Sequence, residues 1–264
     1  MSEQIKINHK KIALIGFYGL LRKECQRFLR IWPQTLLPPA ITLILYFLIF
    51  GTVMGARVGQ MSGVPYAVFI TPGLIMMPVM MNAYMNVVSS FYSAKFTRSI
   101  EEILVSPMPD WLMLLGYCSG GSARGICIAL IAYLVSAFFA GIHIAHPVLF
   151  ILGILLISFL FSLAGFFNAL FSRNFDDTTI VTTFVLTPLT YLAGIFYSIS
   201  LLPPFWRHIS LMNPIYYFVD IFRYSLLGLS DCNIYFAMSF IILILIFLFF
   251  LNLFCLRKGY GLKG

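Results

Sequence analysis

Long uninterrupted runs of apolar residues, separated by short polar segments, dominate the chain. A transmembrane helix needs about 20 mostly apolar residues to cross about 30 Å of hydrocarbon. The pattern predicts six such spans, at 35–55, 66–92, 112–141, 147–171, 178–200 and 233–256. A membrane β-barrel would require short segments of alternating polarity, which these runs lack. The sequence therefore predicts an all-α, polytopic membrane protein with six transmembrane helices.

The fifth predicted span is interrupted by prolines. The stretch VLTPLTYLAGIFYSISLLPPFW carries Pro188 near its start and stops at the proline pair 203–204. A proline removes one intrahelical hydrogen bond and kinks the helix, which membrane helices tolerate where a neighbour or a cavity satisfies the freed carbonyl group. Thr187, Thr190 and Tyr191 offer hydroxyl groups for this purpose. Thr187, Pro188 and Tyr191 are therefore candidates for a pathway through the membrane or its gate.

A short helix is expected after this stop. Asn213 is a favourable cap for a helix whose first residue is Pro214, and Gly228 marks its end. At 1.5 Å per residue the helix would be about 22 Å long, too short to span, so we expect short outer re-entrant helices before the last span. Asp220 and Arg223 should face each other or the pathway. The aromatic residues expected at the outer interface are Phe205, Trp206, Tyr216, Tyr217 and Phe218.

The second span, FITPGLIMMPVMMNAYMNVVSS, is also broken. Pro72 and Pro78 interrupt it, and Asn82 and Asn86 place polar groups toward its inner end. Matching proline-broken spans in the two halves of a membrane protein indicate where its pathway lies. These four residues are therefore pathway candidates, and the alternative is that the kinks serve only helix packing.

Small residues recur in the third span. Gly116, Gly120, Gly121 and Gly125 give G-x-x-x-G spacings, which allow two helices to approach closely. The pattern fits either packing within one chain or a seam between two copies.

The polar stretch FYSAKFTRSIEEILVSPMPDW, between the second and third spans, predicts a short amphipathic helix over 94–106. Its apolar face is formed by Phe96, Ile100, Ile103 and Leu104, and its polar face by Lys95, Arg98, Ser99, Glu102 and Ser106. Arg98 can reach Glu101 and Glu102 at i+3 and i+4. Such a helix is either an interfacial connector or a surface that a partner protein grips.

The first 33 residues predict a second amphipathic helix, with no cleavable signal peptide. One face carries Leu21, Cys25, Phe28, Leu29 and Trp32, and the opposite face carries Arg22, Lys23, Gln26, Arg27 and Arg30. This arrangement is typical of a helix lying on an anionic membrane surface. The alternative is a basic tail that only sets topology.

Composition and charge agree with a membrane protein. Of 264 residues, 61% are hydrophobic and 10% are charged, against roughly 45–50% and 25% in soluble domains. Most of the 17 Lys and Arg residues lie in the N-terminal segment, the 93–111 and 172–177 loops and the C-terminal tail. The positive-inside rule therefore places both termini in the cytoplasm. The net charge of +8 is then a topology signal and not a sign of nucleic-acid binding.

One cation, Arg124, falls inside the third apolar run. Residues 126–142 alone supply enough apolar positions to span, so Arg124 fits at the inner interface, where its charge can reach water. The alternative is a charge that lines the pathway.

The chain shows no pattern typical of catalysis or metal binding. Its five cysteines have no C-x-x-C spacing, and its four histidines are scattered apart from His143 and His146 in one short outer loop. A histidine pair without acidic or cysteine neighbours is more typical of a solvated loop than of a metal site. Phosphate-loop, hydrolase and metalloprotease motifs are absent. We therefore expect no catalytic residue, no metal and no cofactor bound by this chain.

Two long motif blocks resemble a known family. The segment SAKFTRSIEEILVSP resembles the coupling segment of ABC-2 type transport permeases, and FDDTTIVTTFVLTPLTYLAGIFYSISLLPPFW followed by NPIYYFVDIFRYSLLG is similar to the family's second half. The resemblance implies a membrane subunit that pairs with itself and with two copies of a separate ATP-binding ABC subunit, on which ATP and Mg would be bound. It also implies a cytoplasmic coupling helix, with the partner contact expected at Lys95, Arg98, Glu101, Glu102 and Ser106.

The expected function is the permease subunit of an ATP-driven exporter in the bacterial inner membrane, in contact with lipid. Residues 1–33 would form an N-terminal cytoplasmic or interfacial helix and 34–264 the transmembrane domain. ATP closure in the partner would be transmitted through 94–106. An ion-coupled secondary transporter is the alternative, disfavoured because no acidic residue is expected well inside a span. An intramembrane enzyme is disfavoured by the missing catalytic set.

Overall fold

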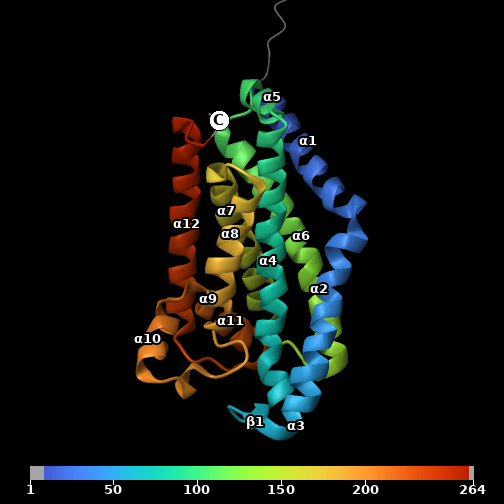
Figure 1. Ribbon diagram of the computed structural model, residues 1–264, viewed down its shortest axis with the longest axis vertical. Helices are drawn as coiled ribbons and strands as arrows, with labels where there is room; N and C mark the ends of the chain where they lie inside the picture. Colours follow the sequence, from blue (N-terminus) through green and yellow to red (C-terminus); the bar gives the residue numbers. More distant parts are fainter. Residues whose placement is uncertain (1–8, 262–264) are drawn as a thin grey trace, which may run out of the picture.

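Long helices packed side by side form the molecule (Figure 1). The structure, a computed structural model, describes residues 9–261, and in this part the only strands are one two-residue antiparallel pair. The expected all-α polytopic architecture is confirmed. Five helical segments are long and apolar enough to cross a membrane: Trp32–Val58, Tyr66–Phe96, Asp110–Ala140, Pro147–Phe171 and Ile234–Lys258.

The N-terminal half contains the first two of these spans. It runs through α1 (His9–Arg30), α2 (Trp32–Tyr46), the π-helix η1 (Phe47–Met54), α3 (Gly55–Val58), β1 (Gln60–Met61), β2 (Val64–Pro65) and α4 (Tyr66–Phe96). The strands are joined by Ser62 and Gly63, which adopt positive φ angles of 52° and 82°. Positive φ at both turn residues is what a type I′ hairpin requires. This hairpin reverses the chain between the first two spans.

The second half has three further spans and a set of shorter helices. It runs through α5 (Ile100–Val105), α6 (Asp110–Ala140), α7 (Pro147–Phe171), α8 (Phe175–Val181), η2 (Thr182–Leu186), α9 (Thr187–Tyr191), η3 (Ile199–Leu201), α10 (Pro204–Met212), α11 (Pro214–Leu227) and α12 (Ile234–Lys258). Asn213 caps α11, because its Oδ1 accepts a hydrogen bond of 3.0 Å from the Ile215 amide, and Gly228 ends it at φ 70°. The predicted boundaries of this short helix are therefore confirmed.

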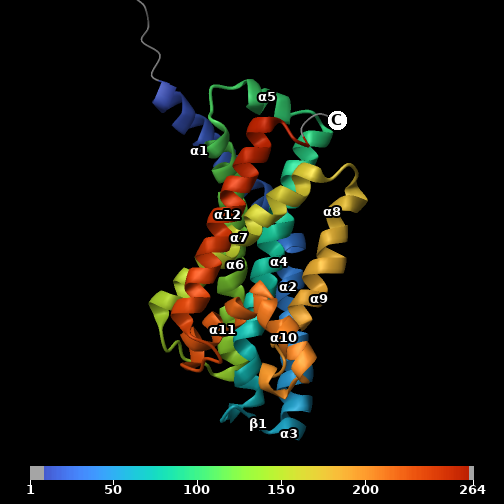
Figure 2. The ribbon, with the colours of Figure 1, turned by 90° about the vertical axis from the view of Figure 1, so that its left-hand side faces the viewer.

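α4 is the central helix of the bundle, as both ribbon views show (Figures 1 and 2). It packs against α6, α7 and α11, and residues such as Ile75, Met76 and Val79 are completely buried. Lipid tails are as apolar as these side chains, so association of the helices depends on close packing more than on the hydrophobic effect. The positions where helices approach most closely are therefore the ones that hold the bundle together.

The glycine stripe of α6 provides such positions within one chain. A Cβ added at Gly116 would lie 2.6 Å from Leu20, and one at Gly120 would clash with Glu24. The absence of side chains at these two glycines therefore lets α1 pack closely on α6. The other two glycines of the stripe face α4 and α7 in the same way. Of the two uses left open by the sequence, the structure shows internal packing.

The two ends of the molecule differ. The start of α1, α5 and the end of α12 lie at one end, whereas α3, β1 and α10 lie toward the other (Figures 1 and 2). Both described ends of the chain are therefore on the same side of the bundle, which agrees with an even number of crossings. The residues before 9 and after 261, including Lys263, lie outside the described part.

The fifth predicted span, 178–200, differs from the structure. Its helical run covers 175–191 and ends at Tyr191, after which the chain turns at Gly194 with φ 73°. At 1.5 Å per residue this run is about 25 Å long, shorter than the ~30 Å of the hydrocarbon core. The predicted end at residue 200 was wrong because apolar composition continues past the point where the helix stops. The count of six spans stays a prediction.

The sequence predicted an apolar face of α1 on the membrane surface but not which face packs on the protein, and of that apolar face Phe28 is buried in the bundle. The buried side chains are Ala13, Leu20, Glu24 and Phe28, whereas Leu29 and Trp32, expected on the apolar face, are about half exposed. α1 packs against α6, so the glycines described above determine which face is covered. The expected division into 1–33 and 34–264 is not tested by this contact and stays a prediction.

Candidate functional site

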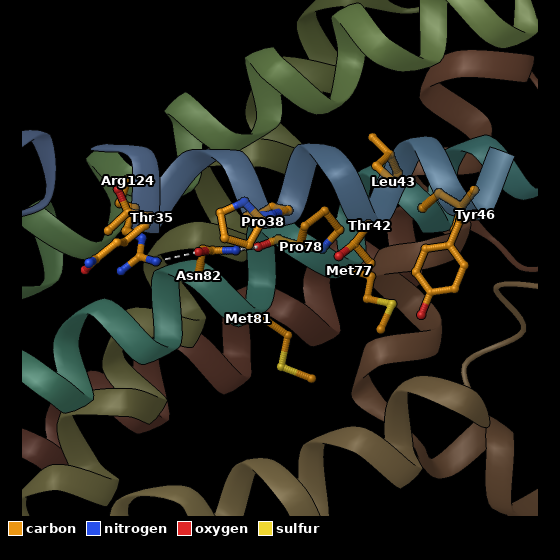
Figure 3. A pocket seen from close by; sticks show the side chains of 13 residues that line it. Thr35, Pro38, Thr42, Leu43, Tyr46, Met77, Pro78, Met81, Asn82 and Arg124 are labelled. Atoms are coloured by element: carbon orange, nitrogen blue, oxygen red, sulfur yellow. Dashed lines mark hydrogen bonds between the residues drawn. The ribbon is translucent and has the colours of Figure 1, made fainter. Parts of the chain in front are cut away.

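A cavity of about 380 Å³ lies between α2, α4 and α6. Its wall is mostly apolar, and the apolar lining includes Pro38, Leu43, Tyr46, Leu74, Met77 and Met81. Polar groups gather at one end, where Thr35, Asn82 and Arg124 lie, and Tyr46 lies at the other end (Figure 3). The cavity therefore has a polar end near Arg124 and a mostly apolar wall toward Tyr46.

Pro78 and Asn82 shape the polar end of this cavity. Pro78 has no N–H to donate to the carbonyl group four residues earlier, that of Leu74, and both residues line the cavity. The Asn82 Nδ2 donates to the Pro78 carbonyl at 2.9 Å, and its Oδ1 accepts from Arg124 Nη2 at 2.7 Å (Figure 3). The half-buried Arg124 thus lies beside the cavity. This position does not distinguish between its two interpretations, at the inner interface or lining a pathway.

A second polar cluster, which sequence reasoning missed, lies one helical turn further along α4. Glu24 is completely buried and accepts hydrogen bonds from Ser90 Oγ at 2.6 Å and Arg27 Nη2 at 3.3 Å. Arg27 Nη2 also donates to the Asn86 carbonyl oxygen at 2.7 Å and to its Oδ1 at 3.0 Å. The only sequence signal was an acidic residue three positions before an arginine in a basic helix. Asn86 therefore joins α1 to α4 and does not line the cavity.

The remaining proline candidate of α4, Pro72, is buried in the packed core. The neighbouring Gly73 packs against the loop that follows α9, since a Cβ added at Gly73 would lie 2.6 Å from Ile195. Of the four candidates on α4, only Pro78 and Asn82 line the cavity.

The helix expected over 94–106 is interrupted. α4 continues to Phe96, Arg98 adopts a left-handed conformation with φ 57°, and α5 starts only at Ile100. Phe96 is 67% exposed whereas Ile100 is buried, so the two do not share one apolar face. The prediction of a single amphipathic helix was wrong because the chain turns at Arg98, which local periodicity does not reveal.

The tip of this connector carries exposed charges. Arg98, Glu101 and Glu102 are all exposed, and among the described residues no ion pair joins Arg98 to either glutamate. A charged surface without internal partners is available to another protein. We call these three residues the tip charges.

The other two residues expected to contact a partner bond within the chain. Lys95 Nζ donates to the carbonyl groups of Ala169, Leu170 and Ser172 at 3.1, 2.6 and 3.2 Å, at the end of α7. A cation is favourable there, because the last carbonyl groups of a helix lack intrahelical donors. Ser106 Oγ donates to Ile103 O at 2.6 Å. The structure thus gives Lys95 and Ser106 intramolecular roles.

The gate candidates of the fifth span lie away from the cavity. The π-helix η2 ends just before Pro188, and the Thr187 hydroxyl donates to the Thr182 carbonyl at 2.9 Å. The Thr190 hydroxyl donates to the Leu186 carbonyl at 2.6 Å. Neither hydroxyl bonds the carbonyl group four residues before Pro188, that of Phe184, and the Thr182 carbonyl already accepts from the Thr187 amide, so the expected satisfaction of the freed carbonyl group is not observed. The side chain of Tyr191 is 51% exposed, and none of the three candidates lines the cavity.

Asp220 and Arg223 do not form an ion pair with each other, and the alternative that they face a pathway is not tested. Asp220 is completely buried and accepts from the Asp231 amide and the Ser230 hydroxyl, both at 2.8 Å. Arg223 Nη1 donates to Asp231 Oδ2 at 3.0 Å and its Nη2 donates to the Gly194 carbonyl at 2.8 Å. Each residue therefore holds a loop against α11, and the expected mutual pairing was wrong.

Asp220 also binds the side chain of Cys232, which lies in the loop between α11 and α12. The Cys232 thiol donates to Asp220 Oδ2 at 2.9 Å, and burial together with this carboxylate raises the pKa of the thiol to about 12. Because the thiolate is the reactive form, the raised pKa favours the unreactive thiol of Cys232.

α11 is buried on nearly all sides. Tyr216, Tyr217 and Phe218 are at most 8% exposed, so they belong to the core and not to the outer interface where they were expected. Phe205 and Trp206 of α10 are exposed, as expected. α11 packs on α4, α7 and α12, so its side chains are buried around most of its circumference.

Comparison with known proteins agrees with this architecture. The family model of the ABC-2 type transporter matches residues 16–227. The chain therefore belongs to the ABC-2 type transporter family, a class of polytopic, all-α transport proteins, and the expected resemblance is confirmed.

Among its relatives, the chain is 47% identical to the inner membrane transport permease YadH of Escherichia coli K12, over 95% of this chain and 98% of YadH. It is also 22% identical to nodulation protein J of Neorhizobium galegae, over 93% of this chain and 94% of that protein. The similarity to both relatives thus extends through nearly the whole chain, which includes the cavity, the tip charges and α11.

Proposed function

We propose that this chain is the membrane subunit of an ATP-driven exporter of the inner membrane. It would work as a homodimer with two copies of a separate ATP-binding subunit, which would carry ATP and Mg. Membership of the ABC-2 family and the likeness to YadH support the membrane and transport parts of this proposal.

The observation that carries the coupling part is the position of α5. α5 is the direct link between α4 and α6, and these two helices form walls of the cavity. A push on the exposed tip charges is therefore applied to the two helices that bound the cavity. Only the short non-helical segments 97–99 and 106–109 separate α5 from these helices, so we expect such a push to shift α4 and α6 and to change the width of the cavity.

The coupling proposal predicts a charge-specific defect. Arg98→Glu or Glu102→Lys should weaken association with the ATP-binding subunit, or uncouple ATP hydrolysis from transport, at least tenfold. Stability should change by only about 0–1 kcal/mol, since both charges are exposed. Co-purification and nucleotide-dependent transport in vesicles measure the effect. Arg207→Glu, an exposed charge on α10 at the other end, is the matched control and should behave as wild type.

The outcome that contradicts this prediction is normal assembly and normal transport-linked hydrolysis in both tip variants. The segment 97–106 would then be a passive connector between two spans.

Topology gives a second prediction. With α5 and both described chain ends on one side, reporter fusions after Asp110 and Gly264 should report cytoplasm, and fusions after Gln60 and His146 the periplasm. The physical reason is the concentration of Lys and Arg at that end. Paired alkaline phosphatase and fluorescent protein fusions measure it, and a periplasmic C-terminus would contradict the predicted six-span topology with cytoplasmic termini.

An ion-coupled transporter is the second candidate, because the structure buries a carboxylate, that of Glu24, which the sequence analysis did not predict. Buried acids in membrane proteins often serve ion coupling. Glu24 is, however, engaged by Arg27 and Ser90. Transport that follows a proton gradient in vesicles without nucleotide would favour this candidate, whereas dependence on ATP favours the exporter.

A further inference from the structure

No acidic side chain among residues 9–261 forms an ion pair with Arg124. Among the described residues the ion pairs are Arg27 with Glu24 and Arg223 with Asp231. Arg124 has a neutral partner, Asn82, and its Nε is buried without a hydrogen-bond acceptor. A guanidinium removed from water without a counter-ion is costly, so its presence indicates a use for the charge.

The part of the chain that the structure describes places no anion around Arg124. The cavity is lined by no Asp or Glu, and the polar side chains at its inner part are Gln34, Thr35 and Asn82. Apart from Thr42 and the hydroxyl group of Tyr46, the rest of the wall is apolar and extends from Arg124 toward Tyr46 (Figure 3). A ligand that satisfies both ends must carry an anionic head group and an apolar tail.

We propose that this cavity binds a single-chain aliphatic carboxylate, with the carboxylate on Arg124 and the chain along α2 and α4. One unbalanced guanidinium matches one negative charge, and its planar donors match a carboxylate. A volume of about 380 Å³ is near the small end of ligand pockets, roughly 300–1,000 Å³, which favours one chain over two. That such a molecule is the exported substrate rests on the proposed function, but its binding does not.

Arg124 should decide the selectivity of this site. Inside a membrane the chain of the ligand leaves lipid for an equally apolar wall, so its burial contributes little to affinity. The charge-assisted hydrogen bonds to the carboxylate have no equivalent in the hydrocarbon core. Removing the head group or the guanidinium should therefore cost more affinity than shortening the chain.

The test uses the full chain in nanodiscs of zwitterionic phosphatidylcholine, with a diazirine-bearing hexadecanoic acid as the probe. Photolabelling should map to α2 and α4 residues of the cavity wall. Unlabelled hexadecanoate should compete, whereas hexadecanol and hexadecyltrimethylammonium should compete at least tenfold less well. Arg124→Gln should reduce site labelling about tenfold to a hundredfold, the effect of losing hydrogen bonds to a charged group. Arg207→Gln is the matched control and should label as wild type.

Asn82→Asp is the second variant, because it keeps Arg124 and the shape of the side chain. It places a carboxylate beside the guanidinium, so it should also reduce labelling at least tenfold, even if Arg124→Gln folds poorly. Undiminished labelling in Asn82→Asp, or equal competition by hexadecanol, overturns the proposal. Hexadecyl phosphate competing tenfold better than hexadecanoate overturns the choice of carboxylate. Because the readout is binding without nucleotide, a chain that labels normally but shows no ATP-driven transport contradicts the proposed function alone.

Discussion

Replacement of Glu24 by alanine is expected to lower the free energy of unfolding by about 3 kcal/mol, the low end of the cost of breaking a buried ion pair from one side. Glu24 is completely buried, whereas the Arg27 side chain keeps 32% exposure, which limits the cost of leaving it unpaired. The variant also removes the acceptor of the Ser90 hydroxyl. Thermal unfolding in detergent should show a midpoint lower by roughly 5–10 °C.

Two further variants separate the cost of leaving Arg27 unpaired from the cost of lost packing at position 24. Glu24→Ala combined with Arg27→Met should recover about half of the loss, because no unpaired cation remains. Lys23→Ala, on the exposed neighbouring position, should change the midpoint little. If Glu24→Ala unfolds at the wild-type temperature, water reaches this junction and the cluster does not stabilise α1 on α4.

Replacement of Gly165 by alanine is expected to destabilise the α4–α7 contact by roughly 3 kcal/mol, at the upper end of overpacking costs. A Cβ at this position would lie 2.5 Å from the Tyr84 carbonyl oxygen. This atom is backbone, so a side-chain rotation cannot relieve the clash and the two helices must move apart. The gain of up to about 1 kcal/mol in helix propensity does not offset it. The fraction of monodisperse protein after heating, measured by size-exclusion chromatography, should fall.

Gly19→Ala is the matched control for this substitution. Gly19 is also helical, but an added Cβ there meets nothing within 4 Å. The control should therefore be neutral or slightly more stable, since alanine is the better helix former. Equal heat resistance of the two variants would show that α4 and α7 are not packed through Gly165.

Features that depend on local chemistry were predictable. Uninterrupted apolar runs specified helices of spanning length, because backbone polar groups in lipid must be satisfied within the helix. The capping of α11 by Asn213 and its end at Gly228 followed from residue types that favour these conformations. The threonines around Pro188 donate to carbonyl groups four or five residues earlier in the same helix, but not to the carbonyl group that the proline leaves free.

Part of the candidate site was also predictable. Pro78 and Asn82 could be recognised because proline and asparagine are unusual in the middle of an apolar span. The tip charges could be recognised by their position between two spans. The pairing of Asp220 with Arg223 could not, because the true partners, Asp231 and the Gly194 carbonyl, come from loops brought together by folding.

The sequence by itself determined the helical class, the length of most spans and the ends of the short helix α11. It did not determine which face of each helix meets the protein, because lipid-facing and protein-facing sides of a membrane helix are both apolar and no periodic contrast marks them. Only the tertiary structure decided that α1 lies on the glycines of α6 with Glu24 buried, and that Arg124 lies beside a cavity. Both results depend on contacts between helices distant in sequence, whose close packing selects one orientation among several that composition allows.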